Sequence, residues 1–112
     1  MLAASNLKSL EALFEREGEH RSYAPGQQLL EAGDLSQGVW WIKSGSVRSL
    51  AALPPKNDWR TVQLHRSGEL VGWLGLIHAR PMESLRAAEP TTAFFVDAAR
   101  FQVLWHVNTD LK

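Results

Sequence analysis

One stretch of the sequence, Gly68 to Ala88 (GELVGWLGLIHARPMESLRAA), has residue types that suit a loop holding a phosphate group. Its glycines allow sharp turns. The apolar run Gly72 to Ile77 predicts a short helix, and the N–H groups at a helix start attract anions. Small residues and an arginine close the stretch. Trp73, Met82 and Glu83 do not suit an anionic ligand, so the pattern predicts the backbone frame of a phosphate-binding loop with unsuitable side chains at these positions.

Metal and covalent chemistry find little support in the sequence. Without cysteine there is no disulfide, thiolate metal site or cysteine nucleophile. No serine lies in a nucleophile-elbow pattern, and no ATPase-type phosphate loop is present. The histidines lack the close His-x-His pair, followed by a glutamate, that β-roll metal sites use; they are His20, His65, His78 and His106. We therefore expect no metal site and no catalytic residues.

Adjacent tryptophans in a strand-like segment raise the question of a stacking platform or a docking patch. Trp40 and Trp41 must point to opposite faces of a strand, so at most one lies inside a barrel. Aromatic core is the favoured role for most tryptophans. As an alternative, the outward one, together with Trp59 and Trp105, forms an exposed apolar patch that docks a partner.

Composition limits the classes of function. A chain of 112 residues suits one domain, and a formal net charge of zero argues against direct nucleic-acid contact. The longest apolar run, Val71 to Ile77, is too short to span a bilayer, and the N-terminus lacks the features of a signal peptide. We therefore expect a soluble, cytoplasmic domain without membrane insertion.

The remaining pattern predicts helices at the two ends and short strands between them. Apolar residues recur at helical spacing in the first segment, at Leu7, Leu10, Leu13 and Phe14. Strand-like runs follow, separated by turn signals: QQLLEAG, then GVWWIKSGSVRSLAAL folded about Ser44-Gly45, then WRTVQLH and TTAFFV. Asp97 can cap a closing helix that carries Phe101, Leu104, Trp105 and Val107 on one side.

This order predicts a mainly β (α+β) fold in a single domain, residues 1–112. We expect a jelly-roll or double-stranded β-helix barrel of about eight short strands, flanked by helices. The N-terminal helix occupies about residues 1–18, the β-roll residues 19–96, and the start of a C-terminal helical region residues 97–112.

Four motifs in this order give the chain a family resemblance. They are YAPGQQLLEAGD, VWWIKSGSV, SGELVGWLGLI and RAAEPTTAFFVDAARFQVL. From about Phe14 to Leu111 the chain resembles the cyclic nucleotide-binding domain, a jelly-roll found in the bacterial catabolite activator, in cyclic-nucleotide-dependent kinases and in gated channels. The third motif is similar to the entry of the family's phosphate-binding cassette, here residues 68–88.

The resemblance also implies where ligand contacts belong. In the family, a glycine and a glutamate begin the cassette helix, the glutamate binds the ribose hydroxyl, and a later arginine pairs with the cyclic phosphate. Gly72 matches the glycine, but Trp73 holds the glutamate position, followed by Leu74. The arginine position falls at Pro81 or Met82.

The charges around the arginine position are also altered. Glu83 adds like-charge repulsion if it points inward. Arg80 lies one position from the family's arginine, whereas Arg86 continues a strand and resembles a residue that does not touch phosphate. The candidate cassette positions are Gly72, Trp73, Leu74, Arg80, Met82 and Glu83.

These features predict a non-catalytic regulatory domain of cyclic nucleotide-binding type with a degenerate cassette. We expect it to be the N-terminal part of a larger, bacterial protein: a transcription regulator, a channel or a transporter. Cyclic AMP or cyclic GMP is disfavoured as a ligand, and no other cofactor is expected. Two alternatives stay open. One is a competent small-ligand sensor that uses Arg80 and the cassette N–H groups, and the other is a protein-interaction or homodimerisation module.

Overall fold

The computed structural model describes residues 4–30, 38–53, 58–72 and 84–107. The described elements are, in chain order, α1 (Ala4–Glu17), β1 (Glu19–Tyr23), β2 (Gln28–Leu30), β3 (Gly38–Ser44), β4 (Ser46–Leu53), β5 (Asp58–Arg66), β6 (Leu70–Val71), β7 (Ser84–Ala87), β8 (Thr91–Asp97) and α3 (Ala98–Val107). The prediction of a mainly β fold with a helix near each end is confirmed. No helix among these elements is long and apolar enough to cross a bilayer.

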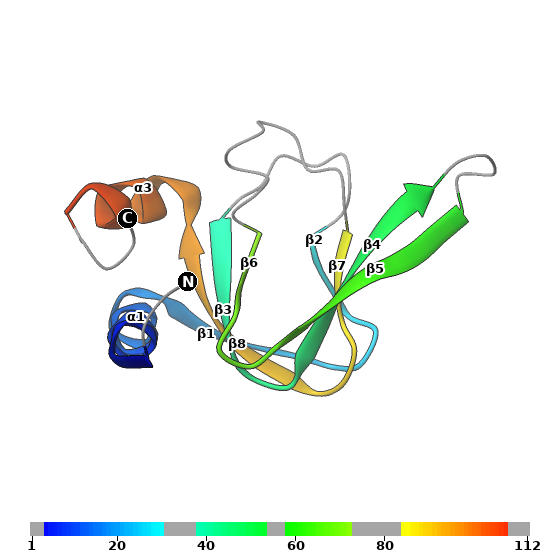
Figure 1. Cartoon of the computed structure of the whole chain (residues 1–112), viewed down its shortest axis with the longest axis horizontal. Coiled ribbons are helices and arrows are strands. Elements are labelled where there is room, and N and C mark those ends of the chain that lie inside the picture. The colour runs from blue at the N-terminus through cyan, green and yellow to red at the C-terminus, as the bar shows by residue number, and fades with distance from the viewer. Residues whose placement is uncertain (1–3, 31–37, 54–57, 73–83, 108–112) are drawn as a thin grey trace.

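The strands form two antiparallel sheets. Sheet 1 has the order β1-β8-β3-β6, and sheet 2 has the order β2-β7-β4-β5. Figure 1 shows the sheets facing each other, with α1 and α3 beside sheet 1 and the β4–β5 hairpin projecting away from the body. The predicted turn at Ser44-Gly45 is confirmed, because β3 ends at Ser44 and β4 begins at Ser46. The predicted hairpin is wrong, because the two strands lie in different sheets and do not pair with each other.

Two apolar clusters hold these layers together. The helix core lies between the helices and sheet 1 and comprises Leu10, Leu13, Phe14, Val39, Trp41, Phe94, Val96, Phe101 and Leu104. The roll core comprises Tyr23, Leu30, Trp40, Ile42, Val47, Val71, Leu85, Ala87, Ala93 and Phe95. Strands β3 and β8 supply residues to both cores, because successive side chains point to opposite faces of a strand.

The adjacent tryptophans follow this alternation and confirm the favoured role of aromatic core, whereas the alternative of an exposed outward tryptophan is wrong for this pair. Trp40 lies in the roll core and Trp41 in the helix core, and the two side chains are 2% and 3% exposed. The Phe14 ring covers Trp41, with ring centroids 6.1 Å apart. Trp59 on β5 is exposed, as the docking hypothesis requires, whereas the side chain of Trp105 lies outside the described part.

The closing helix begins where the sequence indicates. The backbone N–H of Arg100 donates to the Asp97 carboxylate at 2.8 Å, so Asp97 caps α3 as predicted. The Arg100 guanidinium donates to the carboxylate of Glu17, the last residue of α1. This ion pair links the two helices that cover sheet 1. For the predicted strand QQLLEAG, the structure describes β2 as far as Leu30, and the remainder is outside the described residues.

Candidate ligand-binding site

The entrance of the cassette is at Gly72, directly after β6. Its φ is +93°, a left-handed conformation that L side chains rarely adopt. A Cβ atom at this position would lie 2.8 Å from two ring carbons of Trp40 and 2.9 Å from the carbonyl oxygen of Gly38. Both the backbone angle and the close approach therefore require glycine. The edge of the six-membered ring of the Trp40 indole forms the floor beneath Gly72.

The cassette leaves one sheet and enters the other. Val71 pairs with Trp40 in sheet 1, whereas Ser84 pairs with Leu50 in sheet 2. Of the candidate site residues, Gly72 is described; Trp73, Leu74, Arg80, Met82 and Glu83 lie outside the described residues, as do Pro81 and His78. The structure thus fixes both ends of the cassette and the surface beneath its entrance.

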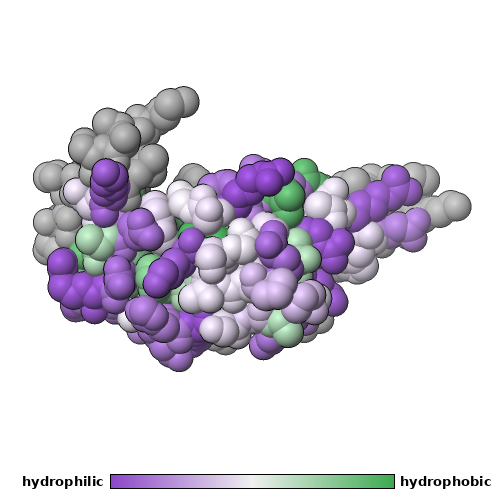
Figure 2. All heavy atoms as spheres, turned by 90° about the horizontal axis from the view of Figure 1, so that it is seen from below, coloured by the Kyte–Doolittle hydropathy of each residue, from purple (hydrophilic) through white to green (hydrophobic). Residues whose placement is uncertain are grey.

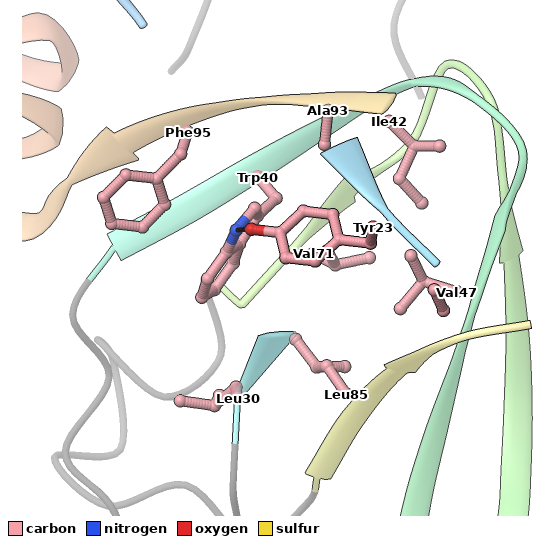
Figure 3. Packing of buried hydrophobic residues seen from close by; sticks show 10 residues of the cluster. Tyr23, Leu30, Trp40, Ile42, Val47, Val71, Leu85, Ala93 and Phe95 are labelled. Carbon is pink, nitrogen blue, oxygen red and sulfur yellow. Dashed lines mark hydrogen bonds between the residues drawn. The ribbon is translucent and has the colours of Figure 1, made fainter. Parts of the chain in front are cut away.

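This floor is apolar, and its polar atoms are paired. The indole N–H of Trp40 donates to the Tyr23 hydroxyl oxygen at 3.0 Å in a buried hydrogen bond. The Phe95 ring packs at 5.0 Å from the Trp40 ring, measured between centroids. Figure 3 shows the Trp40 nitrogen facing the Tyr23 oxygen, with Leu30, Val71 and Leu85 around them. Sequence reasoning missed this hydrogen bond, because its partners lie on strands that are not neighbours in sequence.

Two arginines near the cassette point away from the roll core. Arg86 is exposed and lies between buried Leu85 and Ala87 on β7. It pairs directly with Arg48 on β4, which lies between the buried residues Val47 and Ser49. That Arg86 does not serve as the phosphate arginine stays a prediction.

A third arginine reaches the edge of the roll core on the far side from the cassette. Arg21 lies on β1, and its guanidinium carbon is 3.9 Å from the centroid of the Phe95 ring. It also donates to Glu19 at 3.3 Å. Three strand spacings separate β1 from β6 in sheet 1, which is about 14 Å. Arg21 is therefore too far from Gly72 to pair with an anion there.

The remaining described arginines lie at helix ends or on β5. Arg16 and Arg100 contact Glu17 at the helix ends, and Arg60 and Arg66 are exposed on β5. Each described arginine thus lies on β1, β4, β5, β7 or a helix, and none lies on β6, the strand that leads to Gly72. Arg80 is the one arginine of the sequence that lies outside them.

The turn before β6 is stabilised by an acidic residue to which the sequence reasoning gave no role. The Glu69 carboxylate accepts a hydrogen bond from the backbone N–H of Arg66 at 2.6 Å and lies 3.3 Å from Nδ1 of His65. The backbone of the turn pairs with Ile42 on β3 through Gly68 N–H, at 2.8 Å, and Glu69 C=O, at 3.0 Å. These contacts fix the position of the turn and therefore that of β6 and of Gly72, which follows it.

Within the described part of the chain, no three histidine, aspartate or glutamate side chains gather as a metal site would require. His65 is engaged with Glu69, and His20 packs against the Phe94 ring at 4.5 Å. The His65–Glu69 contact belongs to the turn and has no nucleophile beside it among the hydrogen bonds described. It therefore has a structural role.

Comparison with solved structures places this arrangement in a known fold. The Thermus thermophilus catabolite activator protein matches with a TM-score of 0.78 and 24% identity, over 98% of this chain and 50% of that chain. The c-di-GMP responsive global regulator CLP of Xanthomonas campestris matches with a TM-score of 0.77 and 22% identity, over 89% of this chain and 48% of that chain. The present chain thus spans about half the length of these two regulators.

A eukaryotic protein has the same fold. The regulatory subunit of a cAMP-independent protein kinase A from Trypanosoma brucei matches with a TM-score of 0.78 and 15% identity, over 91% of this chain and 39% of that chain. Among curated proteins, none matches the sequence significantly. The family model described as the cyclic nucleotide-binding domain, however, matches residues 20–108. The chain therefore belongs to the cyclic nucleotide-binding domain family.

Proposed function

We propose that this chain is the non-catalytic regulatory domain of a larger protein and that it does not bind cyclic nucleotide in the family's usual way. One observation carries the proposal: the positions where the family's phosphate arginine belongs hold Pro81 and Met82, so a cyclic phosphate would lack the paired cation that it needs there. Burying a phosphate anion without such a partner costs several kcal/mol, which backbone donors offset only in part. The indole at Trp73 adds a second deficit, because it cannot accept a hydrogen bond from a ribose hydroxyl.

The lengths and printed names of the structural relatives support a larger host protein. Two of the structural relatives are transcription-regulating proteins about twice as long as this chain, and a third is a kinase regulatory subunit. A roll of this kind acts on another segment of its protein, so we propose a cytoplasmic host whose activity it modulates. A transcription regulator, a channel and a transporter are the three classes that we consider.

Calorimetric titration with cyclic AMP and cyclic GMP tests the proposal on the chain as it stands. We expect no binding heat at millimolar nucleotide. Micromolar binding that Arg80→Ala abolishes and Arg60→Ala leaves intact would establish the alternative, a competent sensor that uses Arg80. Arg60 is a suitable control because it is exposed on β5, away from Gly72.

Restoring the missing groups gives a second test in the opposite direction. The variant Trp73→Glu/Met82→Arg returns a ribose acceptor and a phosphate partner to the cassette. We expect measurable binding to appear, because the fold and the Gly72 turn are retained. Each charge-assisted hydrogen bond contributes about 1.5–3 kcal/mol. If the restored variant stays silent, the loss of binding lies in the roll itself and not in these two positions.

A second candidate function, a protein-interaction module, is favoured by the surface of β5. This strand is at the edge of sheet 2, and its exposed apolar residues are Trp59 at 53%, Val62 at 50% and Leu64 at 39%. Edge strands with apolar side chains readily pair with another chain. The face of the molecule shown in Figure 2 is mainly hydrophilic, with small, separate hydrophobic areas.

Sedimentation velocity distinguishes a self-associating module from a monomeric one. If β5 mediates dimerisation, the natural chain sediments as a dimer at high concentration and Val62→Lys sediments as a monomer. Val103→Lys is the matched control, because Val103 is equally exposed, at 50%, but lies on α3. A natural chain that remains monomeric at the highest soluble concentration would contradict dimerisation.

A further inference from the structure

The outer face of sheet 2 carries a row of donors that the function proposed above does not use. The strand register places Gln28 opposite Arg86, Arg86 opposite Arg48, and Arg48 opposite Leu64. Directly opposed residues lie on the same face of a sheet. The row therefore crosses β2, β7, β4 and β5 on the side away from the roll core. We call Gln28, Arg86 and Arg48 the donor row; Leu64 is the apolar residue beside its end on β5.

No described helix covers this face. The most extensive contacts that α1 and α3 make with strands are with β3 and β8 of sheet 1. Figure 1 shows both helices on the far side of sheet 1, with nothing comparable beside β2, β7 and β4 among the labelled elements. Arg86 is exposed, and Leu64 at the end of the row is 39% exposed. A partner can therefore approach the donor row from outside the domain.

The charges and hydrogen bonds of the donor row are incomplete. Arg48 and Arg86 face each other across neighbouring strands, an arrangement of like charges that destabilises a sheet. Nε of Arg48 and Nε2 of Gln28 are both buried and have no hydrogen-bond partner. Among the described ion pairs, none involves Arg48 or Arg86. Arg48 and Gln28 thus have buried donors without an acceptor in the described part of the chain, and the exposed Arg86 lies directly between them in the register.

Such an arrangement needs an acceptor from elsewhere. Buried donors without partners are rare in folded proteins, because each one loses its hydrogen bonds to water without replacement. An arriving oxyanion would pair the donors and offset the repulsion between the two arginines at the same time. The exposed Arg86 side chain opposite Arg48 can pair with the same anion.

We propose that the donor row binds a carboxylate of an acidic protein segment, with an apolar side chain of that segment resting on Leu64. The planar guanidinium fork matches a carboxylate in two parallel hydrogen bonds. The exposed leucine beside Arg48 favours an occupant that is both acidic and apolar over a free anion. A net charge of zero gives the chain no general attraction for polyanions such as nucleic acid.

Nuclear magnetic resonance titration of the labelled chain tests the proposal. The probe is a short capped peptide of alternating glutamate and leucine. Its controls are the same peptide with glutamine in place of glutamate, and inorganic phosphate. We expect the acidic peptide to shift the Nε–H signals of Arg48 and Arg86 and the side-chain amide signals of Gln28. The glutamine peptide and phosphate should leave these signals in place.

Matched variants separate the donor row from general charge attraction. Arg86→Gln is expected to weaken binding of the acidic peptide at least about tenfold, the loss of one charged hydrogen bond. Arg60→Gln removes the same charge from an exposed site on β5 outside the row and should leave the affinity within about twofold. Equal losses in the two variants would overturn the proposal. So would an absence of shifts, or shifts that phosphate causes and the peptide does not.

A stability measurement adds a readout that a merely structural arginine would not give. Arg48→Met removes the buried, unpaired Nε and the repulsion with Arg86 while keeping an unbranched side chain that reaches about as far as Nε. We expect this variant to melt at a higher temperature than the natural chain and to lose binding of the acidic peptide. A lower melting temperature would assign Arg48 a structural role and contradict the proposal. This test is independent of nucleotide binding, because the donor row points away from Gly72 and the roll core.

Discussion

At the scale of single residues, the cassette entrance depends on the contact between Gly72 and Trp40. The glycine has a φ of +93°, and the indole lies where a side chain would begin. The same indole uses its N–H to reach Tyr23 across the roll core. Trp40 therefore cannot move to accommodate a larger residue without breaking a buried hydrogen bond. The entrance is rigid because both its backbone and its floor are fixed.

Gly72→Ala should destabilise the domain more than the same change at Gly68. Both glycines have positive φ, at +93° and +86°, so each substitution incurs backbone strain of about 1–3 kcal/mol. A Cβ at Gly68 meets nothing within 4 Å, whereas at Gly72 it meets Trp40 at 2.8 Å. Urea denaturation measures both free energies of unfolding. Equal losses in the two variants would show that the Trp40 contact yields without cost.

The sequence predicts some of these residues and not others, for a physical reason. Gly72 is recognisable because a glycine after two apolar residues and before a helix-like run is a local pattern. The Tyr23–Trp40 hydrogen bond is not, because β1 and β3 become close only when β8 pairs between them. The donor row of Gln28, Arg86 and Arg48 is hidden in the same way. Its members meet only through the register of three strands far apart in sequence.

At the scale of elements, the two helices form one layer over the helix core, and an ion pair joins them. Arg100 on α3 donates to Glu17 at the end of α1, and Phe14 contacts Phe101 with ring centroids 6.4 Å apart. The hydrogen bond from Arg100 lowers the pKa of the Glu17 carboxyl below its usual value. A carboxyl whose pKa is lower in the folded state stabilises the fold above the pKa of the unfolded state. That contribution is lost as the pH falls through the pKa of the folded state.

Glu17→Gln should therefore reduce stability at neutral pH and make little difference in acid. Below the folded pKa both proteins lack the charge at this position, so their urea midpoints should converge. The gap should open as the pH rises from the folded pKa and should be complete above the usual pKa of a glutamate, about 4.3. Glu15→Gln is the control, because Glu15 is exposed, lies two residues before Glu17 on α1 and has no described ion pair. A gap between natural chain and Glu17→Gln that is independent of pH would contradict this role of the carboxylate.

Element patterns were read correctly where they were local, and they failed where tertiary packing decides. Alternation and turn residues predicted β3, β4, β5 and β8, and Asp97 predicted the start of α3. Alternation also put Trp40 and Trp41 on opposite faces. It did not reveal that α1 covers the outer face and buries Trp41, which excludes that tryptophan from the alternative of an exposed docking patch. The pattern of a strand specifies its two faces but not what packs on each of them.

At the scale of the whole molecule, sheet 1 lies between two apolar cores. Four motifs in order predicted the roll and the family, because turn residues and strand lengths repeat in this fold at constant spacing. Between Gly72 and Ser84, the chemistry of the cassette is indicated by the sequence alone. The titrations proposed above test whether this segment binds a nucleotide. The two cores, in contrast, are fully specified and make a prediction about folding.

We expect the two cores to unfold together. Phe14→Ala removes a fully buried ring from the helix core and should cost about 3–5 kcal/mol, while Leu85→Ala in the roll core should cost about 2–5 kcal/mol. Because β3 and β8 supply both cores, damage to either one loosens the sheet that the other needs. In each variant, the urea transitions measured by tryptophan fluorescence and by far-ultraviolet circular dichroism should therefore coincide. Phe14→Leu and Leu85→Val are milder substitutes if a variant fails to fold. Separate transitions in the Phe14 variants alone would mean that the helix layer melts from an intact roll, and that a partner of this domain is able to displace it.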